Sequence, residues 1–235
     1  MSSATRQHRR PPDDRDAELA NGDRMQQEEF HRKYEAYPED AKFELIAGTV
    51  YMASPLRQPH GAHHFLLNWL LGIYTAETPG VEGLDNATIL LDKDNEPQPD
   101  LTLRVLPEFG GNTSLTPESY VKGAPELICE IAHSTRAIDL HQKKNAYRKA
   151  GVGEYLVLSI EEGEVAWFDF KARRAIIPNP DGISKSRIFP GLWLLLPALI
   201  ARGRKDLMAT LRSGLQSPEH AAFVKRMNGR RERKV

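Results

Sequence analysis

A single carboxylate lies inside an apolar stretch of the chain. Residues 125–132 read Pro-Glu-Leu-Ile-Cys-Glu-Ile-Ala, with Glu130 between Cys129 and Ile131. The stretch is typical of a buried strand, and it leads through a short loop into a helix. Because an ionised carboxylate is costly to bury unless a cation or a metal ion compensates it, Glu130 is the first candidate for chemistry.

Three further ionisable residues, Glu44, Asp100 and Lys143, lie within or at the ends of predicted strands and helices. Each of the four has an ordinary explanation when taken alone. Glu44 fits the outward face of a strand and Asp100 the start of one. Glu130 fits an ion pair with an arginine, and Lys143 fits an i,i+4 pair with Asp139 on a helix face.

Together the four residues indicate a different chemistry. Two or three acidic side chains on adjacent strands can hold Mg²⁺, which prefers oxygen ligands and keeps some of its water. The metal lowers the pKa of a bound water and neutralises charge on a phosphodiester in the transition state. A nearby lysine can orient that water and stabilise the developing negative charge. The set therefore favours metal-assisted phosphodiester hydrolysis.

The position of the lysine is unusual for this chemistry. In nucleases of this kind the lysine follows the second acid by two residues on the same strand, and here that position is Ala132. Lys143 would have to reach the acids from the next helix, one turn beyond Asp139. Asp139 could be the N-cap of that helix or a partner that holds Lys143, and the residue type favours the cap.

The predicted elements place these residues on a mixed sheet. We expect helices over residues 24–36, 59–76, 139–150 and 206–226, and the last of them is interrupted near residues 217–218. We expect strands over residues 42–46, 49–52, 87–92, 100–105, 126–131, 154–159, 164–170 and 188–196. In the helix over 59–76, the period makes Phe65 and Trp69 part of the apolar face. This order predicts an α/β or α+β domain with a mixed central β-sheet flanked by helices. We expect one domain over residues 25–200, with a disordered tail over 1–24 and a basic helical extension over 201–235.

The composition of the chain indicates the class of protein and the compartment in which it works. The chain has 235 residues, of which 40% are hydrophobic and 27% charged, as in a soluble globular protein. The single Cys129 excludes an internal disulfide and predicts a cytoplasmic protein. The longest apolar run, residues 192–200, is about half of the roughly 20 residues that a membrane helix needs. The net charge is zero, but residues 201–235 carry ten Lys or Arg and three Asp or Glu, so nucleic-acid contact by this segment is an open alternative to a solvated end.

Two groups of motifs resemble a known family. The first runs from Phe43-Glu44-Leu45-Ile46 through Gly48, Val50-Tyr51-Met52 and Ser54-Pro55 to His60 and Pro97-x-Pro99-Asp100. The second is Gly123-Ala-Pro-Glu-Leu-Ile-Cys-Glu-Ile-Ala followed by Asp139-Leu-x-x-Lys143-x-x-x-Tyr147-Arg148-x-Ala150-Gly151. Over residues 40–195 the chain resembles the Uma-two family of restriction endonucleases, which is similar to the PD-(D/E)XK nuclease superfamily. The resemblance implies a restriction-endonuclease-like core with the lysine moved onto a helix.

The resemblance also implies roles for individual residues. Asp100 and Glu130 would be the metal ligands, with Mg²⁺ or Mn²⁺ as the metal, and Glu44 an additional acid. Lys143 would be the catalytic lysine, supported by Tyr147 one turn further along the helix. His60 aligns with a family position near the site. The loop after Glu130, Ala132-His133-Ser134-Thr135, departs from the Ser-Pro-Ser-Thr pattern of many members.

These observations predict a Mg²⁺-dependent endodeoxyribonuclease whose partner is DNA. Cutting of both strands of a duplex would favour a homodimer. The alternative is a nucleic-acid-binding or regulatory protein that uses a nuclease scaffold without turnover. A glycosidase with paired carboxylates is disfavoured because Lys143 has no role in that chemistry.

Overall fold

The centre of the molecule is one six-stranded mixed sheet. The computed structural model describes residues 18–38, 41–133 and 136–232. The strands, in sheet order, are β11 (Arg174–Ala175), β10 (Glu164–Asp169), β9 (Glu154–Ser159), β8 (Leu127–Ala132), β5 (Leu101–Val105) and β3 (Val81–Asp85). Only the central pair, β8 and β9, is parallel, and the other neighbours are antiparallel. The predicted mixed sheet flanked by helices is confirmed.

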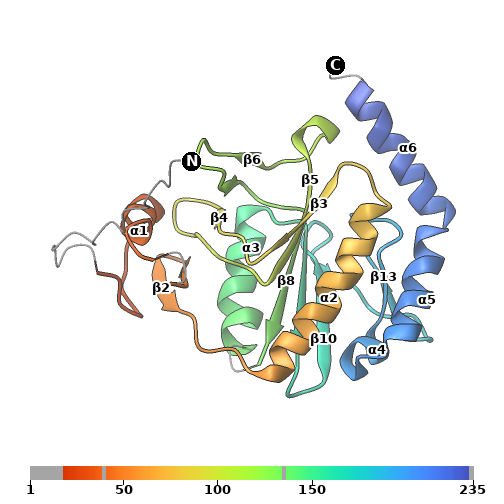
Figure 1. The fold of residues 1–235 in the computed structure, drawn as a ribbon, viewed down its shortest axis with the longest axis horizontal. Helices are drawn as coiled ribbons and strands as arrows, with labels where there is room; N and C mark the ends of the chain where they lie inside the picture. The colour runs from red at the N-terminus through yellow and green to blue at the C-terminus, as the bar shows by residue number, and fades with distance from the viewer. Residues whose placement is uncertain (1–17, 39–40, 134–135, 233–235) are drawn as a thin grey trace, which may run out of the picture.

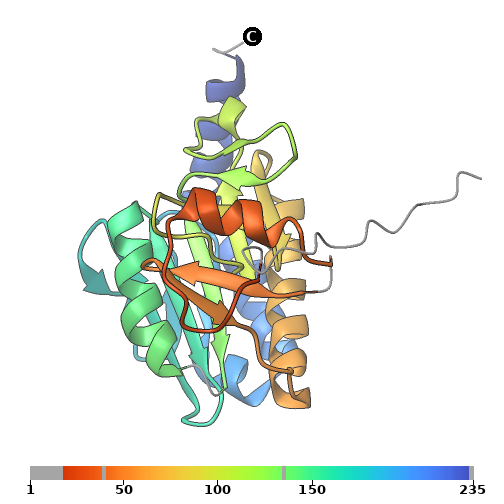
Figure 2. The ribbon, with the colours of Figure 1, turned by 90° about the vertical axis from the view of Figure 1, so that its left-hand side faces the viewer.

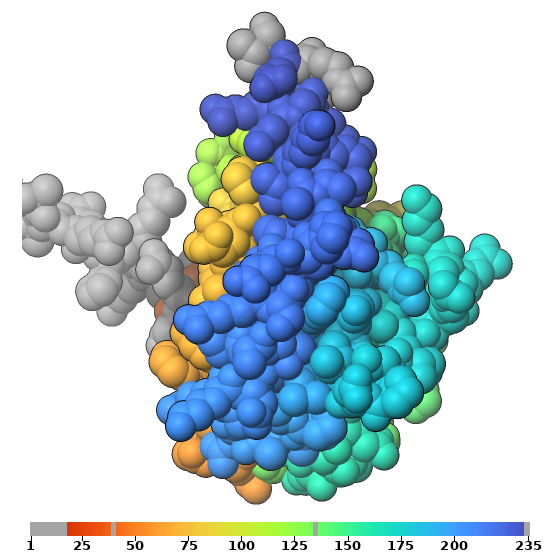
Figure 3. All heavy atoms as spheres, turned by 90° about the vertical axis from the view of Figure 1, so that its right-hand side faces the viewer, coloured from red at the N-terminus to blue at the C-terminus, as the bar shows by residue number. Residues whose placement is uncertain are grey.

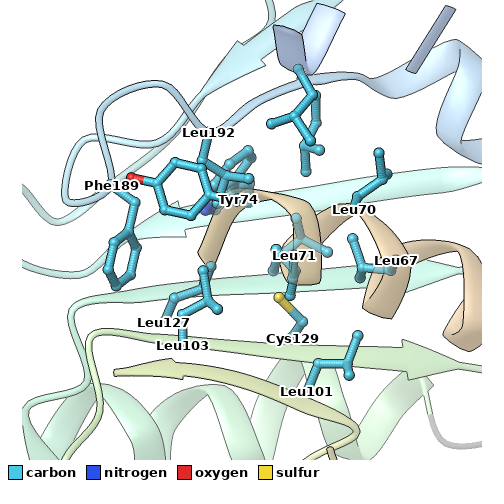
Figure 4. Close-up of a cluster of buried hydrophobic side chains, with 14 of the residues drawn as sticks. Leu67, Leu70, Leu71, Tyr74, Leu101, Leu103, Leu127, Cys129, Phe189 and Leu192 are labelled. Carbon is cyan, nitrogen blue, oxygen red and sulfur yellow. The ribbon is translucent and has the colours of Figure 1, made fainter. Parts of the chain in front are cut away.

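Helices cover both faces of this sheet (Figure 1). On one face lies α3 (Lys144–Ala150), and on the other lies α2 (Gln58–Ala76) with α5 (Arg204–Leu215) beyond it. Because both faces are covered, every residue of β8 and β9 is buried. Figure 4 shows the core on the α2 side, where Cys129 and Leu127 lie beneath Leu71 and Tyr74.

Strand alternation decides which way Glu130 faces. Leu127, Cys129 and Ile131 belong to the core on the α2 side, whereas Ile128 and Ala132 pack in the second core beneath α3. Successive side chains of a strand point to opposite faces, so Glu130 points to the α3 side together with Ile128 and Ala132.

An N-terminal unit packs beside the sheet and carries Glu44. It consists of α1 (Gln27–Tyr34) and the hairpin of β1 (Phe43–Ile46) and β2 (Thr49–Met52), with a small core of its own. Ala47 and Gly48 both have positive φ, 50° and 72°, as a tight two-residue hairpin turn requires. A bridge between Leu45 and Glu96 joins the unit to the main domain. In Figure 2 the hairpin lies between α3 and α2.

Shorter elements complete the chain. They are β4 (Ile89–Leu90), η2 (Pro107–Phe109), β6 (Ser114–Leu115), β7 (Val121–Lys122), η3 (Ile138–Lys143), β12 (Ile183–Lys185), β13 (Trp193–Leu195), α4 (Leu196–Ala201) and α6 (Pro218–Glu232). No helix among the described residues is long and apolar enough to cross a bilayer.

Several details differ from the sequence predictions. Strand β3, at the sheet edge, was not predicted, because Glu82, Gly83 and Asp85 hide its apolar alternation. Phe65 was expected on the apolar face of α2, but its side chain is 68% exposed. The tail was predicted to be disordered to residue 24. Residues 1–17 lie outside the described part of the chain, while Leu19 is buried in the N-terminal core and Arg24 bridges to β2.

Candidate active site

Glu130 lies on β8, and Asp100 directly precedes β5, the neighbouring strand of the central sheet. Strands β5 and β8 are antiparallel, with Leu101 opposite Cys129. Asp100 is one position beyond this last pair, and its charge is close enough to Glu130 to raise the pKa of Glu130. The sheet itself brings together the two carboxylates that the sequence predicted as metal ligands.

Lys143 lies at the centre of the site. Its Nζ is 3.0 Å from Oε1 of Glu130 and 2.8 Å from Oε2 of Glu44, and both contacts are ion pairs. A third carboxylate, that of Asp139, is 3.8 Å away. The predicted arrival of the lysine from the helix after β8 is thus observed, and its direct partners are Glu130 and Glu44 rather than Asp100.

The local backbone explains how Lys143 reaches the sheet. Residues 138–143 form the π-helical segment η3, which continues into α3. A π-helical turn is wider than an α-helical one, and such turns are frequent at functional sites. The predicted N-cap role of Asp139 is wrong, because the N-cap is Ala137 and Asp139 is the second residue of η3. Asp139 is instead a buried carboxylate facing Lys143, the alternative that the sequence left open.

The other predicted side chains fix the carboxylates. The Tyr147 hydroxyl donates to Oε1 of Glu130 at 2.8 Å. The backbone N–H of Gln98 donates to Glu44 at 2.8 Å. Gln98 is a contact that the sequence analysis missed, because no residue pattern signals a backbone donor that lies 54 positions from its acceptor.

Asp100 has a separate set of partners. Its Oδ2 accepts a hydrogen bond from the backbone N–H of Ile131 at 2.7 Å, and its Oδ1 is 3.3 Å from Nε2 of His60. His60 is buried, and its ring lies stacked on that of His64, with centroids 6.0 Å apart. Of the remaining histidines of α2, His63 forms hydrogen bonds with the backbone carbonyls of Pro59 and Ile200.

Burial and charge set the protonation of the cluster. Burial raises the pKa of Glu130 well above its usual value, the ammonium of Lys143 opposes this shift, and the neighbouring carboxylates add to it. For Lys143, burial disfavours the charge, but Glu130, Glu44 and Asp139 outweigh burial and raise its pKa well above the usual value. Burial would raise the pKa of Asp100, yet the hydrogen bond and charge of His60 lower it overall. Lys143 is therefore a fixed cation and Asp100 a fixed anion.

Four carboxyl groups share one ammonium at this site. Glu44, Asp100, Glu130 and Asp139 all lie in the electrostatic field of Lys143 or Glu130. Such an excess of acidic groups suits a divalent cation. Glu130 on β8 and Asp100 just before β5 offer hard oxygen donors, and Mg²⁺ is commonly held by one or two carboxylates while it retains water. No group of three or more His, Cys, Asp or Glu residues within the described ranges is arranged to hold a metal. The residues thus fit a two-carboxylate site whose other ligands would be water or substrate.

Removing the Tyr147 hydroxyl tests how strongly the second helical turn supports Glu130. Tyr147→Phe keeps the buried ring, which packs edge-on against Tyr155, but deletes the bond to Glu130. We expect the free energy of unfolding to fall by about 1–2 kcal/mol, because a hydrogen bond to a charged, buried acceptor is lost. Urea denaturation measures this value. Tyr155→Phe, which deletes a hydroxyl bond to the Asp139 backbone carbonyl, is the matched control. An unchanged free energy of unfolding in Tyr147→Phe would contradict the support of Glu130 by Tyr147.

Comparisons with known proteins identify the family and the fold of the chain. The sequence model of the Uma2 family, described as "Putative restriction endonuclease", matches residues 27–198. No curated protein matches. Among solved structures, the crystal structure of "a putative nuclease belonging to DUF820 from Anabaena variabilis ATCC 29413" superposes with a TM-score of 0.60 at 16% identity, covering 75% of this chain and 98% of that chain. At this identity the structural similarity establishes the fold alone. Because the family match spans most of the chain and includes every residue of the site, the protein belongs to the Uma2 family of putative restriction endonucleases.

Proposed function

We propose that the protein is a divalent-metal-dependent endonuclease that hydrolyses DNA phosphodiester bonds, with Mg²⁺ as the metal and Mn²⁺ as a substitute. The observation that carries the proposal is Lys143, a buried ammonium on a helix that pairs with Glu130 and Glu44 beside Asp100. A lysine that contacts a buried carboxylate beside a second acid supports this chemistry, even though Ala132 stands in the usual lysine position.

The position of each residue suggests its role in the proposed reaction. Asp100 and Glu130 would hold the cation, which would neutralise phosphate charge and lower the pKa of a bound water. Asp100 is already oriented by the Ile131 N–H and His60. The side chain of Glu44 is 18% exposed, against 5% for Glu130, so Glu44 is nearer to solvent. Glu44 and Lys143 would together orient the attacking water, and Glu44 would accept the proton of that water. The ammonium of Lys143 would stabilise negative charge on the phosphate oxygens.

One observation favours a second function from a different class. Lys143 is fully engaged by carboxylates, and within the described ranges no group of three or more His, Cys, Asp or Glu residues is arranged to hold a metal. A protein that binds nucleic acid on this scaffold without turnover would have the same arrangement. The two functions differ in whether the site binds a divalent cation and breaks DNA strands.

A cleavage assay separates the two functions. Supercoiled plasmid, linear duplex and single-stranded DNA are incubated with the protein in Mg²⁺, in Mn²⁺ and in EDTA, and strand breaks are followed on gels. We expect breaks only when a divalent cation is present, and calorimetry should detect binding of the cation. Tight DNA binding without breaks in either metal would favour the non-catalytic alternative. Sedimentation with DNA tests the homodimer that cutting of both strands favours.

A further inference from the structure

The C-terminal extension, α5 and α6, is the most basic part of the described chain. Residues 201–235 carry ten Lys or Arg against three Asp or Glu, a net charge of +7, so the remaining residues carry −7 because the total is zero. The family match ends at residue 198, so the extension lies outside the matched region. A net negative core is poorly suited to a polyanionic substrate, and the extension carries the opposite charge.

The extension is firmly attached to the main domain. Leu207, Leu211, Phe223 and Met227 are buried in the core on the α2 side. The Oγ1 of Thr78, just after α2, lies 3.0 Å from Nε2 of His220 on α6. Its basic side chains are therefore presented from a fixed surface rather than from a flexible tail, and Figure 3 shows α4 to α6 running along one face of the molecule.

The basic side chains on this surface are exposed and are not neutralised. They are Arg202, Arg204, Lys205, Arg212, Lys225, Arg226, Arg230 and Arg231, and all of them are exposed. Within the described part of the chain, no carboxylate forms an ion pair with any of them. Three arginines make other contacts: Arg230 lies 3.5 Å from the Phe109 carbonyl, Arg231 lies over the Phe109 ring and Arg226 lies over the Phe223 ring. The charge is thus available to a partner.

The chemistry of the surface distinguishes among anionic partners. A helix that inserts into a membrane interface has an apolar face beside its basic one. The exposed large hydrophobic residues of the described chain are Met52, Leu56, Phe65, Leu115 and Ile177, and none is in the extension. A nucleic-acid backbone needs only spaced cations, whose counterions are released on binding.

We infer that the exposed lysines and arginines of α5 and α6 bind the phosphate backbone of duplex DNA, without reading its sequence, at a surface separate from the cluster around Lys143. This deepens the proposed function, on which it rests for the choice of DNA. The extension supplies non-specific affinity to a core of the opposite charge and leaves the choice of cleavage position to the active site.

The test measures binding of a fluorescent 30-base-pair duplex by anisotropy, in EDTA, at several salt concentrations. The variant Arg204→Gln, Lys205→Gln, Arg212→Gln, Lys225→Gln removes four exposed charges, none of which forms an ion pair or a ring contact within the described part of the chain. We expect at least about tenfold weaker binding near 0.1 M salt, and a slope of log affinity against log salt that is shallower by about 2–4, because each phosphate contact contributes ~0.9.

A matched control removes the same charge elsewhere. Lys93, Lys122, Lys171 and Arg174 are exposed and lie outside the extension, and their replacement by glutamine should change affinity less than twofold. Equal weakening in the control would overturn the inference in favour of net charge alone, and unchanged binding in the extension variant would overturn it outright. Binding of the wild type to phosphatidylserine vesicles in preference to DNA would also overturn it. If the wild type binds DNA through the extension but does not cut it, the endonuclease proposal is rejected. The inference about the extension then still stands.

Discussion

Lys143→Met is expected to abolish DNA cleavage and to destabilise the protein. The methionine has a similar length but leaves Glu130, Glu44 and Asp139 without their shared cation. Loss of one stabilising cation at a transition state typically costs at least about 10²-fold in rate. Removing one partner of a buried ion pair typically costs about 3–5 kcal/mol, because a buried charge is left uncompensated. Cleavage rates and urea denaturation at pH 8 measure the two effects.

The stability loss of this variant should depend on pH. Burial raises the pKa of Glu130, and Lys143 is the group that opposes the rise. In Lys143→Met the folded state therefore binds a proton at Glu130 more tightly than the unfolded state does. The stabilisation from that proton is fully present below the unfolded pKa and is lost as the pH rises through the folded pKa. We expect the gap between wild type and variant to be smaller at pH 5 than at pH 8.

The adjacent lysine provides the control for this prediction. Lys144 has the same charge, but its Nζ lies 3.6 Å from the centre of the Phe168 ring rather than among carboxylates. Lys144→Met should cost only about 0.5–1 kcal/mol and leave cleavage intact. If Lys143→Met cut DNA as well as Lys144→Met does, the proposed role of Lys143 would be wrong.

Asp100→Asn is the second change with a large expected effect. The amide keeps the shape of the side chain and an oxygen for the Ile131 N–H, so we expect a stability cost of about 1–2 kcal/mol. It loses the negative charge beside Glu130 that a divalent cation needs. Cleavage should fall below detection, and calorimetry should show Mn²⁺ binding at least about tenfold weaker.

A nearby aspartate separates the metal role from a general charge effect. Asp85 lies 3.3 Å from His64 and has a side chain that is 46% exposed. Asp85→Asn should leave both Mn²⁺ affinity and cleavage unchanged. If Asp100→Asn lost cleavage but bound Mn²⁺ with wild-type affinity, Asp100 would not be a metal ligand.

The sequence predicted most of the site because local patterns place most of its residues. The apolar run of residues 125–132 predicts a buried strand with an acid inside it, and the absence of a lysine at Ala132 leaves Lys143 on the next helix as the candidate. The pairing of Lys143 with Glu130 follows from a strand, a short loop and a helix that are consecutive in the chain. Tyr147 follows from Lys143 because the two residues are one helical turn apart.

The errors arose where the physical cause is not local. Asp139 resembles an N-cap, but the π-helical segment η3 begins one residue earlier and directs Asp139 at Lys143. Phe65 fits the apolar period of α2, yet no described element covers that part of the helix surface. Glu44 reaches Lys143 across 99 positions because the N-terminal hairpin is joined to the main domain through Leu45 and Glu96, a pairing that no sequence pattern reports.

The most direct test of the central claim is plasmid cleavage by the wild type and by Lys143→Met, compared side by side in Mg²⁺, Mn²⁺ and EDTA. The predicted result is strand breakage by the wild type in a divalent cation, none in EDTA and none by the variant in any condition. Breakage by the variant at the wild-type rate would contradict the claim that the cluster around Lys143 is the active site, and so would the absence of breakage by the wild type in both metals.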